Sequence, residues 1–453
     1  MPASTSKPLR IAVLADSDTR WKWGALTAHR IAPDSELNGF LLRGRATPTP
    51  RQLAEVGVPV DGVREVTAAE FLGEIEHESY DVVLLALVGG AVQAVLHGLA
   101  PLWPEAARRP VVVTGYVGVV YEKLADGLLL RHGADVVLAN SRHDAERFRA
   151  VYEGVGADAS SVTEAALPFL GGARYEGTAT GGSTATGEGT ATGRATGTGT
   201  GSATGVVVFA AQPSVPQSRA DRTYLLRRLV QHARLHPGRE VVLKLRSRPG
   251  EHTTHIEELP YQRLAARIEG GPPANFRLAY GHMGEVLDRT DLLVTVSSTA
   301  ALEALHRRIP TAVLTDLGVR EALGNHHFLG SGCLASWEQL DAGHRPRADE
   351  EWLARQGVAA DGSYETAFDA VRKRVTGLLE QPELPPLSPY YTTVTAPGYL
   401  PGVLARHRLD GVRDIEVTGV RRVVRDAVRE AARGAYRHGV QRVAPVIRRM
   451  GEL

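Results

Sequence analysis

The chain has 453 residues, and 52 Lys and Arg nearly balance 51 Asp and Glu, which leaves a formal net charge of +1. This balance gives no electrostatic support for nucleic acid as a partner. Because one core stops growing at about 250 to 300 residues, we expect two domains. Cys333 is the single cysteine, so no disulfide can form within the chain, which fits a reducing cytoplasm. The opening MPASTSKPLR lacks an apolar segment with a cleavage site, so no secretory signal is expected.

Short apolar runs alternate with helical stretches along residues 1–176. The runs are RIAVLA, GFLLR, DVVLLAL, PVVVTG and ADVVLAN. Continuous apolar strands that alternate with helices are typical of a parallel sheet covered on both faces. We therefore predict a Rossmann-like α/β domain over residues 1–176.

Polar residues follow the first of these runs in the stretch ADSDTRWKWGALTA. A carboxylate at the end of a parallel strand, Asp16 or Asp18, could act as general base on an acceptor hydroxyl. The alternative for Asp18 is to cap the following helix. Lys22 and Trp23 would then lie on the acceptor side of the same loop.

The stretch VVLLALVGGAVQAVLHGLAPLW, residues 82–103, is long enough to span a bilayer. Gly89 and Gly90 interrupt it, and Gln93 and His97 are polar. A buried strand, a glycine turn and a helix explain the same residues, and we predict this arrangement rather than a membrane span.

A second group of polar and aromatic residues follows PVVVTG. These are Tyr116, Tyr121, Glu122 and Asp126. Aromatic side chains in glycine-rich loops at strand ends suit contacts with a sugar or nucleoside, which would place this group on the acceptor side. Packing of the tyrosines against helices explains them equally well.

The composition changes at residues 177–205, where Gly, Thr and Ala dominate and TATG recurs. A tract with so little apolar bulk is expected to be a flexible linker between domains. The alternation then resumes with GVVVFAA, REVVLKLR, ANFRLAY, TDLLVTV and PTAVLT. We predict a second Rossmann-like domain over residues 206–385, facing the first across a cleft at the carboxyl ends of both sheets.

Hydrogen-bond donors collect at the strand ends of this second domain, and VTVSSTAALEAL sets three hydroxyls at a helix start. The predicted donor-binding residues are Gln212, Pro213, Lys244, Arg246, Arg248, Ser297, Ser298, Thr299 and Glu303. Guanidinium groups, an amide and helix-start N–H groups suit a nucleotide phosphate. Helix capping by the hydroxyls and ordinary ion pairs of the arginines are the alternatives.

Histidines and acids in KLRSRPGEHTTHIEE invite comparison with a metal site. The spacing of His252 and His255 among Glu251, Glu257 and Glu258 matches no established ligand pattern. We expect solvated loop charges here, and no metal or other cofactor.

The order VVVFAAQPSVP, VVLKLRSRPGE and DLLVTVSSTAALEALHRRIPTAVL resembles the C-terminal half of GT-B glycosyltransferases of the bacterial capsule and polysialyltransferase type. RIAVLADSDTRWKWGALTA, with THIE at residues 254–257, also resembles an uncharacterised group of bacterial glycosyltransferases. The resemblance spans roughly residues 9 to 380 and implies the GT-B fold.

Carried over, the resemblance implies that Ser297, Ser298 and Thr299 bind the donor phosphate and that Gln212 and Pro213 line the nucleotide pocket. The histidine of the family's Lys-x-His-Pro segment is replaced by arginine at position 246. Arg246 can stabilise an anionic leaving group but cannot readily give up a proton. The acidic pair before glycine in sialic acid transferases is reduced here to Asp126 and Gly127.

The remaining residues, 386–453, form a C-terminal extension. Its end places an arginine at about every fourth position from Arg421 to Arg437, among valines and alanines. This pattern indicates a basic amphipathic helix that lies on an anionic membrane surface or packs on the first domain.

Together these patterns predict a cytoplasmic glycosyltransferase that moves a sugar from a nucleotide-sugar to a glycan, lipid-linked or small-molecule acceptor, in surface or secondary-metabolite glycan synthesis. The proposed catalytic residues are Asp16, Asp18 and Arg246. The alternatives are a nucleotide-sugar epimerase of the same fold and a non-catalytic nucleotide-binding partner in glycan assembly.

Overall fold

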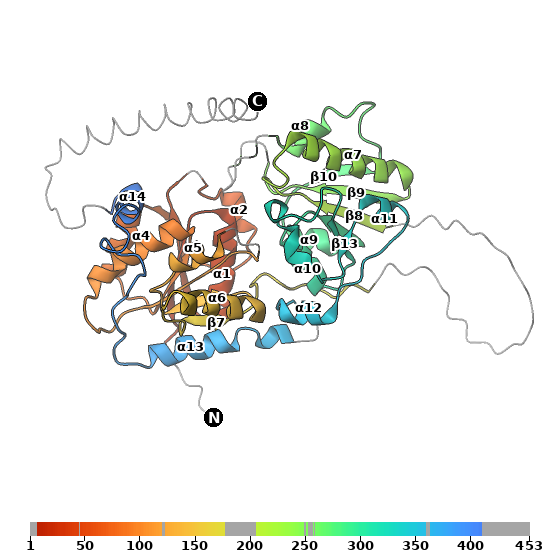
Figure 1. Ribbon diagram of the computed structural model, residues 1–453. Helices are drawn as coiled ribbons and strands as arrows, with labels where there is room; N and C mark the ends of the chain where they lie inside the picture. Colours follow the sequence, from red (N-terminus) through yellow and green to blue (C-terminus); the bar gives the residue numbers. More distant parts are fainter. Residues whose placement is uncertain are drawn as a thin grey trace, which may run out of the picture.

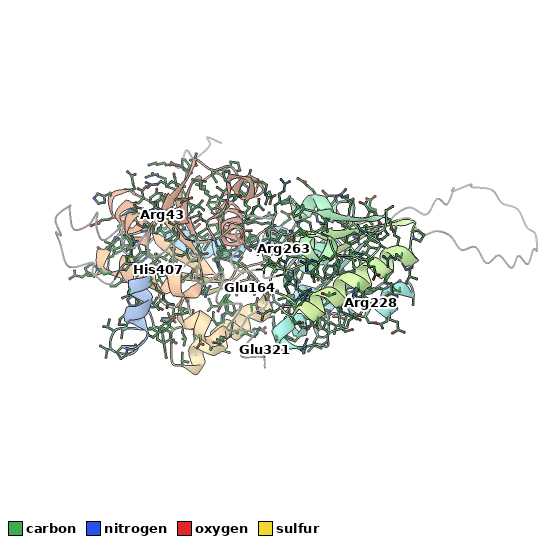
Figure 2. All side chains as sticks on the ribbon, turned by 90° about the horizontal axis from the view of Figure 1, so that it is seen from above. Arg43, Glu164, Arg228, Arg263, Glu321 and His407 are labelled. Carbon is green, nitrogen blue, oxygen red and sulfur yellow. The ribbon has the colours of Figure 1, made fainter. Side chains whose placement is uncertain are left out.

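The computed structural model describes residues 7–44, 46–119, 123–176, 205–248, 251, 257, 259–358 and 363–409. Within these residues the chain forms two α/β domains, each built on a parallel sheet (Figure 1). Seen from above, the domains lie side by side, with Arg43 in one and Arg228 in the other (Figure 2). The predicted fold class is confirmed.

The sheet of the first domain has the strand order β3-β2-β1-β4-β5-β6-β7. Its strands are β1 (Arg10–Ala15), β2 (Glu36–Leu42), β3 (Gly62–Val66), β4 (Val82–Ala86), β5 (Val111–Gly115), β6 (Val136–Ala139) and β7 (Val162–Glu164). The central strands β4, β5 and β6 are buried throughout, as expected for continuous Val and Leu runs between two helix layers. The two edge strands were not predicted from the sequence, because β3 is mostly exposed and β7 is only three residues long.

The sheet of the second domain has the order β10-β9-β8-β11-β12-β13. Its strands are β8 (Gly205–Ala210), β9 (Arg239–Lys244), β10 (Phe276–Ala279), β11 (Leu292–Thr295), β12 (Thr311–Leu314) and β13 (Leu334–Ala335). All five predicted strands are present. The chain therefore places the ends of β9, β8 and β11 next to one another, where the predicted donor-binding residues follow.

Helices cover both faces of the first sheet. They are α1 (Asp18–Ile31), α2 (Pro50–Ala54), α3 (Ala68–His77), α4 (Gly89–Leu99), η1 (Ala100–Leu102), α5 (Leu124–Leu129), α6 (Arg142–Gly154), α13 (Asp369–Leu379) and α14 (Leu400–Arg406). Buried residues of α1 and α13 share one apolar cluster, and those of α3, α4, α5 and α6 share the cluster on the opposite face. Residues 82–103 form β4, α4 and η1, as predicted. Among the described residues no helix is long and apolar enough to cross a membrane.

The second sheet is also covered on both faces. Its helices are α7 (Arg219–Leu235), α8 (Tyr261–Ala265), α9 (Met283–Leu287), α10 (Ala300–His306), η2 (Glu321–Leu323), η3 (Asn325–Phe328), α11 (Trp337–Asp341) and α12 (Glu350–Arg355), followed by η4 (Ser363–Thr366). Residues of α9, α10 and α12 belong to the same apolar cluster as α1 and α13. The core is therefore continuous from one domain to the other, whereas α7, α8 and α11 pack on the outer face.

The chain returns to the first domain earlier than the boundary predicted at residue 385. Val371, Val375 and Leu378 of α13 are buried, and this helix packs on β5, β6 and β7 of the first sheet. Leu384 pairs with Ala107, and α14 packs on α4. The apolar face of α13 explains the difference, because it completes the cover of the first sheet.

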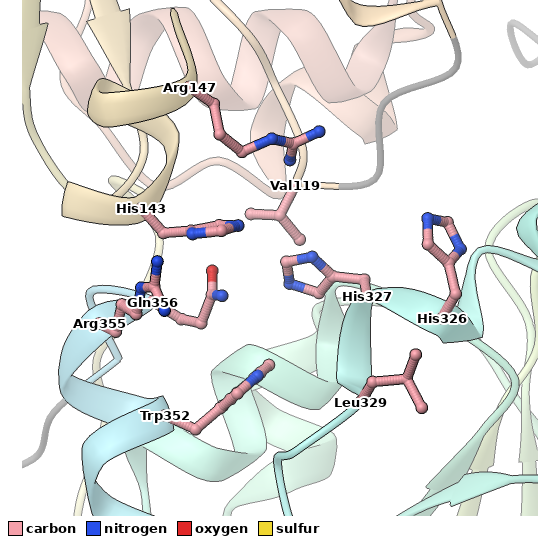
Figure 3. A pocket seen from close by; sticks show the side chains of 9 residues that line it. All are labelled: Val119, His143, Arg147, His326, His327, Leu329, Trp352, Arg355 and Gln356. Carbon is pink, nitrogen blue, oxygen red and sulfur yellow. The ribbon is translucent and has the colours of Figure 1, made fainter. Parts of the chain in front are cut away.

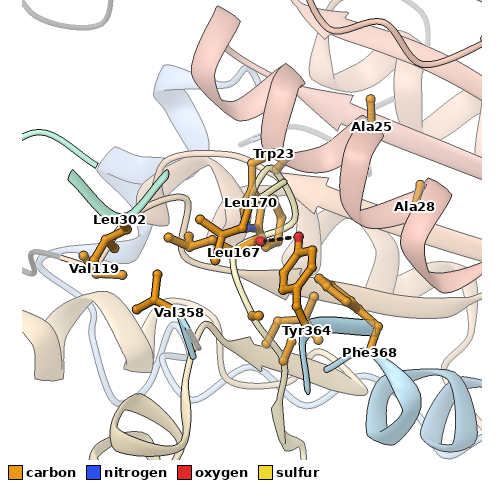
Figure 4. Packing of buried hydrophobic residues seen from close by; sticks show 14 of the residues in the cluster. Trp23, Ala25, Ala28, Val119, Leu167, Leu170, Leu302, Val358, Tyr364 and Phe368 are labelled. Atoms are coloured by element: carbon orange, nitrogen blue, oxygen red, sulfur yellow. Dashed lines mark hydrogen bonds between the residues drawn. The ribbon is translucent and has the colours of Figure 1, made fainter. Parts of the chain in front are cut away.

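Two crossings of the chain between the domains lie in contact (Figure 4). The hydroxyl of Tyr364, on the returning segment, donates to the carbonyl oxygen of Leu167, on the outgoing one, at 2.8 Å. On the outgoing segment, the hydroxyl of Tyr175 also donates to Asp291 at 3.0 Å. The predicted linker before Gly205 and the predicted basic helix after Leu409 lie outside the described residues.

Candidate active site at the domain interface

Polar residues from the two domains meet where the strands β1 and β9 end. The guanidinium of Arg246 contacts both carboxylate oxygens of Asp18, with Nε at 3.2 Å from Oδ2, and it also contacts the hydroxyl of Thr19. Ser17, and not Asp18, occupies the N-cap position of α1. The capping alternative for Asp18 is therefore wrong, and this carboxylate pairs across the domain interface.

A second ion pair crosses the interface beside the first. Arg51 of α2 donates from Nε to Glu251 at 2.6 Å and also contacts Glu55. Glu251 accepts the backbone N–H of Arg248 at 2.8 Å. Partial burial would raise the pKa of Glu251, but the bonds from Arg51 and Arg248 outweigh it and lower the pKa. Glu251 thus fastens the loop after β9 to the first domain.

Lys22 and Glu303 form a third contact between the domains. The Lys22 ammonium lies 3.7 Å from the Glu303 carboxylate and 4.7 Å from the ring centre of Phe169. Glu303 is on α10 and only 7% exposed. A buried carboxylate beside a cation can also accept hydrogen bonds from hydroxyl groups of a ligand.

Lys244 is a buried cation at the end of β9, with 6% of its surface exposed. Its ammonium donates to the carbonyl oxygen of Leu245 at 2.9 Å. Burial lowers the pKa of Lys244 to about 8, although the nearby carboxylates of Glu55 and Glu303 act in the opposite direction. A buried lysine whose pKa is lowered this close to neutral pH is typical of a functional site.

His282 belongs to the same layer of charges and was missed by the sequence analysis. It is half-buried at the N-cap position of α9, where burial and the Lys22 ammonium lower its pKa while Glu303 opposes them. The available signal was its position in the short loop between β10 and α9, since Arg246 occupies the corresponding loop after β9.

The three hydroxyls of VTVSSTAALEAL do not form the predicted open cradle. Ser297 is buried, and its hydroxyl donates to the carbonyl oxygen of Leu323 while its N–H donates to Gln212 at 3.0 Å. The N–H of Ser298 donates to the hydroxyl of Thr295, and Ser298 accepts from Ala300. Most hydrogen-bond donors of this loop therefore already bond to other groups of the second domain.

Thr299 is the exception among the three. Its side chain faces Gly118 of the first domain, since a Cβ on that glycine would lie 3.7 Å from the Thr299 methyl group. The hydroxyl of Thr299 makes no hydrogen bond to any described residue. It remains available to a ligand at the interface.

Gln212 and Pro213 form a turn that is held from inside by Arg222 of α7. This arginine is 2% exposed, donates to the carbonyl oxygens of Gln212 and Pro213 at 3.3 and 3.1 Å, and contacts the carboxylate of Glu257. The Gln212 side chain bonds Ser297 at 3.2 Å. The turn after β8 and the loop after β11 are thus one rigid unit.

Two of the residues predicted as catalytic or acceptor-binding in the first domain, Asp16 and Trp23, are not available to a substrate. Asp16 is held by Arg20 at 2.8 Å and by the backbone N–H of Val88 at 3.0 Å, so both of its oxygens are engaged. Trp23 is 1% exposed and packs in the core, which contradicts a role in contacting an acceptor. Its indole follows the helical period of α1 onto the buried face of that helix.

The loop after β5 gives a similar result. The Tyr116 ring lies under the guanidinium of Arg131 at 4.0 Å and packs against Phe148, inside the first domain. Packing, the alternative for this tyrosine, is therefore correct. Asp126 is exposed in the first turn of α5, and Tyr121 and Glu122 lie outside the described residues.

A possible metal site lies away from the interface, on the outer face of the second domain. His232, His236 and Asp341 bring ligand atoms within 4.8 Å of one another. Asp341 already bonds His232 at 2.7 Å and Arg228 at 3.0 Å. Both oxygens of Asp341 are thus already bonded, Oδ1 to His232 and Oδ2 to the positively charged Arg228, so these residues fit a hydrogen-bonded cluster better than a metal site. His252, His255 and Glu258 lie outside the described residues.

Two parallel α/β domains that meet at the ends of their central strands define the GT-B type of fold. A solved structure titled "S. aureus MnaA-UDP co-structure" is similar to this chain, with a TM-score of 0.50 and 11% sequence identity over 83% of this chain and 99% of that one. The chain belongs to the family described as "Putative glycosyltransferase (DUF6716)", which matches residues 11–376.

Two further structures show weaker similarity. The UDP-N-acetylglucosamine 2-epimerase from Rickettsia bellii has a TM-score of 0.49 and 12% identity, over 82% of this chain and 97% of that chain. The glycotransferase of kitacinnamycin has a TM-score of 0.40 and 13% identity, over 82% and 96%. No curated protein matches the chain.

Proposed function

We propose that this chain transfers a glycosyl group from a nucleotide-sugar to a hydroxyl group of an acceptor. One observation carries the proposal: Asp18 of one domain is paired with Arg246 of the other, at the interface of a GT-B fold in a glycosyltransferase family. A carboxylate and a cation at one point are what glycosyl transfer needs, for the acceptor proton and for the leaving phosphate.

The second domain would hold the donor. Arg246 and Lys244 supply positive charge for the phosphate, and Glu303 accepts from hydroxyl groups of the nucleoside or sugar. We also assign Lys22 to the donor rather than to the acceptor side predicted from the sequence, because its ammonium lies 3.7 Å from Glu303. The rigid turn at Gln212 supports the nucleotide, together with its neighbour Pro213. Ser297 and Ser298 shape the loop, and Thr299 and the exposed Arg248 reach the donor from its edges.

The chemical step displaces the nucleotide at the anomeric carbon. The acceptor hydroxyl gives its proton to the carboxylate of Asp18, and its oxygen forms a bond to the anomeric carbon. The bond from that carbon to the phosphate oxygen breaks, and the nucleotide leaves with the electron pair, stabilised by Arg246. The scheme needs no metal ion, because side chains supply the positive charge.

Donor binding and base activation are coupled in this scheme. In this structure the guanidinium of Arg246 contacts Asp18 and Thr19. A donor phosphate that takes up Arg246 releases the Asp18 carboxylate toward the acceptor. Asp16 is not required as a base, because Arg20 and Val88 occupy both of its oxygens.

The experiment begins with donor binding. A thermal-shift screen with CMP, UDP, GDP and CDP identifies the nucleotide, because a ligand that binds only the native state raises its stability. Arg246→Met should weaken binding by about tenfold or more. Arg267→Met, an exposed arginine of the same domain, is the matched control and should bind as the unmodified protein does.

Catalysis is tested next with a labelled sugar of that nucleotide and a panel of glycan, lipid-linked and small-molecule acceptors. Capsule-type anionic glycans come first, in line with the sequence resemblance. Asp18→Asn should keep or tighten nucleotide binding, because Arg246 is no longer held by a carboxylate, and should lower kcat by about 10² to 10⁴. If Asp18→Asn transfers sugar at the normal rate, the assignment of the base is wrong.

The second candidate is the nucleotide-sugar epimerase of the same fold, and the similarity to S. aureus MnaA, which was solved with UDP, fits a nucleotide ligand in either kind of enzyme. The labelled donor distinguishes it, since an epimerase isomerises the donor without an acceptor. Nucleotide binding with no turnover of either kind would instead support a non-catalytic partner in glycan assembly.

A further inference from the structure

A cavity of about 340 Å³ opens between the domains, beyond the loop that carries Gly118 (Figure 3). The first domain contributes one residue of the loop after β5 and two of α6, and the second contributes η3 and α12. The lining residues are Val119, His143, Arg147, His326, His327, Leu329, Trp352, Arg355 and Gln356. We call this cavity the histidine pocket. Its volume suits a single sugar unit.

The lining of the histidine pocket is cationic. It contains three histidines and two arginines, and none of its nine residues is acidic. Two carboxylates lie near these arginines, Glu146 at 3.7 Å from Arg355 and Asp144 at 4.0 Å from Arg147. An anion in the pocket would therefore meet convergent positive charge from both domains.

Buried polar atoms of the lining lack partners among the described residues. They include Nδ1 of His143, Nε2 of His327 and Oε1 of Gln356, and Gln356 is only 6% exposed. Figure 3 shows the side chains of His143, His327 and Gln356 directed toward the same space. Buried polar groups are normally hydrogen-bonded, so this set points to a polar ligand.

An aromatic wall completes the pocket. The Trp352 ring stacks on Phe328 with centroids 5.7 Å apart and lies 5.8 Å from the His327 ring. An aromatic surface next to charged donors suits a sugar ring that carries an acidic group.

Binding of an anion would change the protonation of two of these histidines. Burial, with His143, His326 and Arg147, lowers the pKa of His327 to about 4. Burial and the positive charges of Arg355 and Arg147 also lower the pKa of His143. The carboxylate of Glu146 acts in the opposite direction. Both rings are therefore neutral near pH 7, and a bound anion would favour their protonated forms.

We propose that the histidine pocket is an oxyanion-binding subsite that takes a carboxylate or phosphate group on the acceptor sugar. The assignment to the acceptor rests on the proposed function, whereas binding of the anion does not. The donor cations Lys22, Lys244 and Arg246 follow β1 and β9, and the pocket lies at the ends of β5, β6 and β12. Donor and acceptor would thus occupy different parts of one interface.

The test is calorimetry on the full chain with three probes: glucuronate, glucose 6-phosphate and uncharged glucose. At about pH 6, at least one acidic probe should bind about tenfold or more tightly than glucose. Binding of the acidic probe should tighten as the pH falls from about 7 toward 5, because the bound anion favours the protonated rings. Glucuronate and glucose 6-phosphate distinguish a carboxylate ligand from a phosphate ligand.

Variants locate the binding. The pair His143→Asn with His327→Asn should weaken the acidic probe by about tenfold or more. His344→Asn, an exposed histidine outside the pocket, is the matched control. If the double variant does not fold, Arg355→Gln replaces it, because this side chain is 57% exposed and its loss leaves the core intact.

Two results would overturn the proposal: glucose bound as tightly as both acidic probes, or no loss of binding in the folded variants. A nucleotide screen on the same protein separates the two proposals. If acidic sugars bind and no nucleotide does, the oxyanion site stands and the proposed glycosyl transfer fails.

Discussion

Replacing Lys244 with methionine should stabilise the protein near neutral pH. Burial lowers the pKa of this lysine from 10.5 to about 8, so the charged form is disfavoured in the folded state. At about 1.4 kcal/mol for each pH unit, the penalty for keeping the charge is about 3 kcal/mol at most. Lys244→Met removes this penalty and keeps a side chain of similar length, which raises Tm by several degrees, about 2 to 4 °C per kcal/mol.

The pH dependence has a definite sign. Between about pH 8 and 10.5 the unfolded lysine holds a proton that the folded one has lost, so the stability of the unmodified protein rises with pH in this window. The advantage of Lys244→Met should be full below about pH 8 and fade above it. Thermal unfolding from pH 6.5 to 10 measures this, with the exposed Lys373→Met as control. A variant no more stable than the unmodified protein at pH 7 would refute the reasoning.

Three further predictions concern the scaffold. Gly115→Ala should cost about 1 to 3 kcal/mol, because the new Cβ would lie 2.9 Å from the Trp23 ring, whereas Gly377→Ala on α13 meets nothing within 4 Å and should be neutral or stabilising in the same thermal unfolding experiment. Cys333 should resist thiol reagents until the protein unfolds, because burial raises its thiol pKa to about 11, and rapid labelling of the native protein would contradict this. Burial lowers the pKa of His232 to about 4, so stability should fall as pH drops from 6.5 toward 4, and His232→Gln should flatten that fall in acid titrations of Tm.

Most strands and their order in the chain could be predicted, because buried parallel strands consist of continuous runs of Val, Leu and Ala. The edge strands of the first sheet could not, since β3 is exposed and carries Arg64 and Glu65 in its short span and β7 has only three residues. The return of the chain to the first domain before residue 385 could not be predicted either. The apolar positions of α13 show that it is amphipathic, but they do not say which sheet it covers.

The location of the candidate site could be predicted from the sequence, but the contacts between its residues could not. Strand ends correctly located Asp18 and Arg246 at one interface, because the topology of parallel sheets fixes where their loops lie. Sequence could not show that Ser297 would bond Leu323, nor that Trp23 would face the core. His282 and the histidine pocket depend on how the domains sit against each other, which no local pattern records.

The hydrogen bond between Tyr364 and Leu167 makes the two crossings of the chain a single pivot. In a swing about a pivot, displacement grows with the length of the lever arm. Helix α2, which carries Arg51 of the Arg51 and Glu251 pair, lies at the interface away from α13 (Figure 1), so this side of the interface would open more than the side next to the pivot. Val119 lines the histidine pocket and shares one apolar cluster with Val358 and Tyr364 (Figure 4), so the pocket lies beside the pivot and its shape would change least in such a swing.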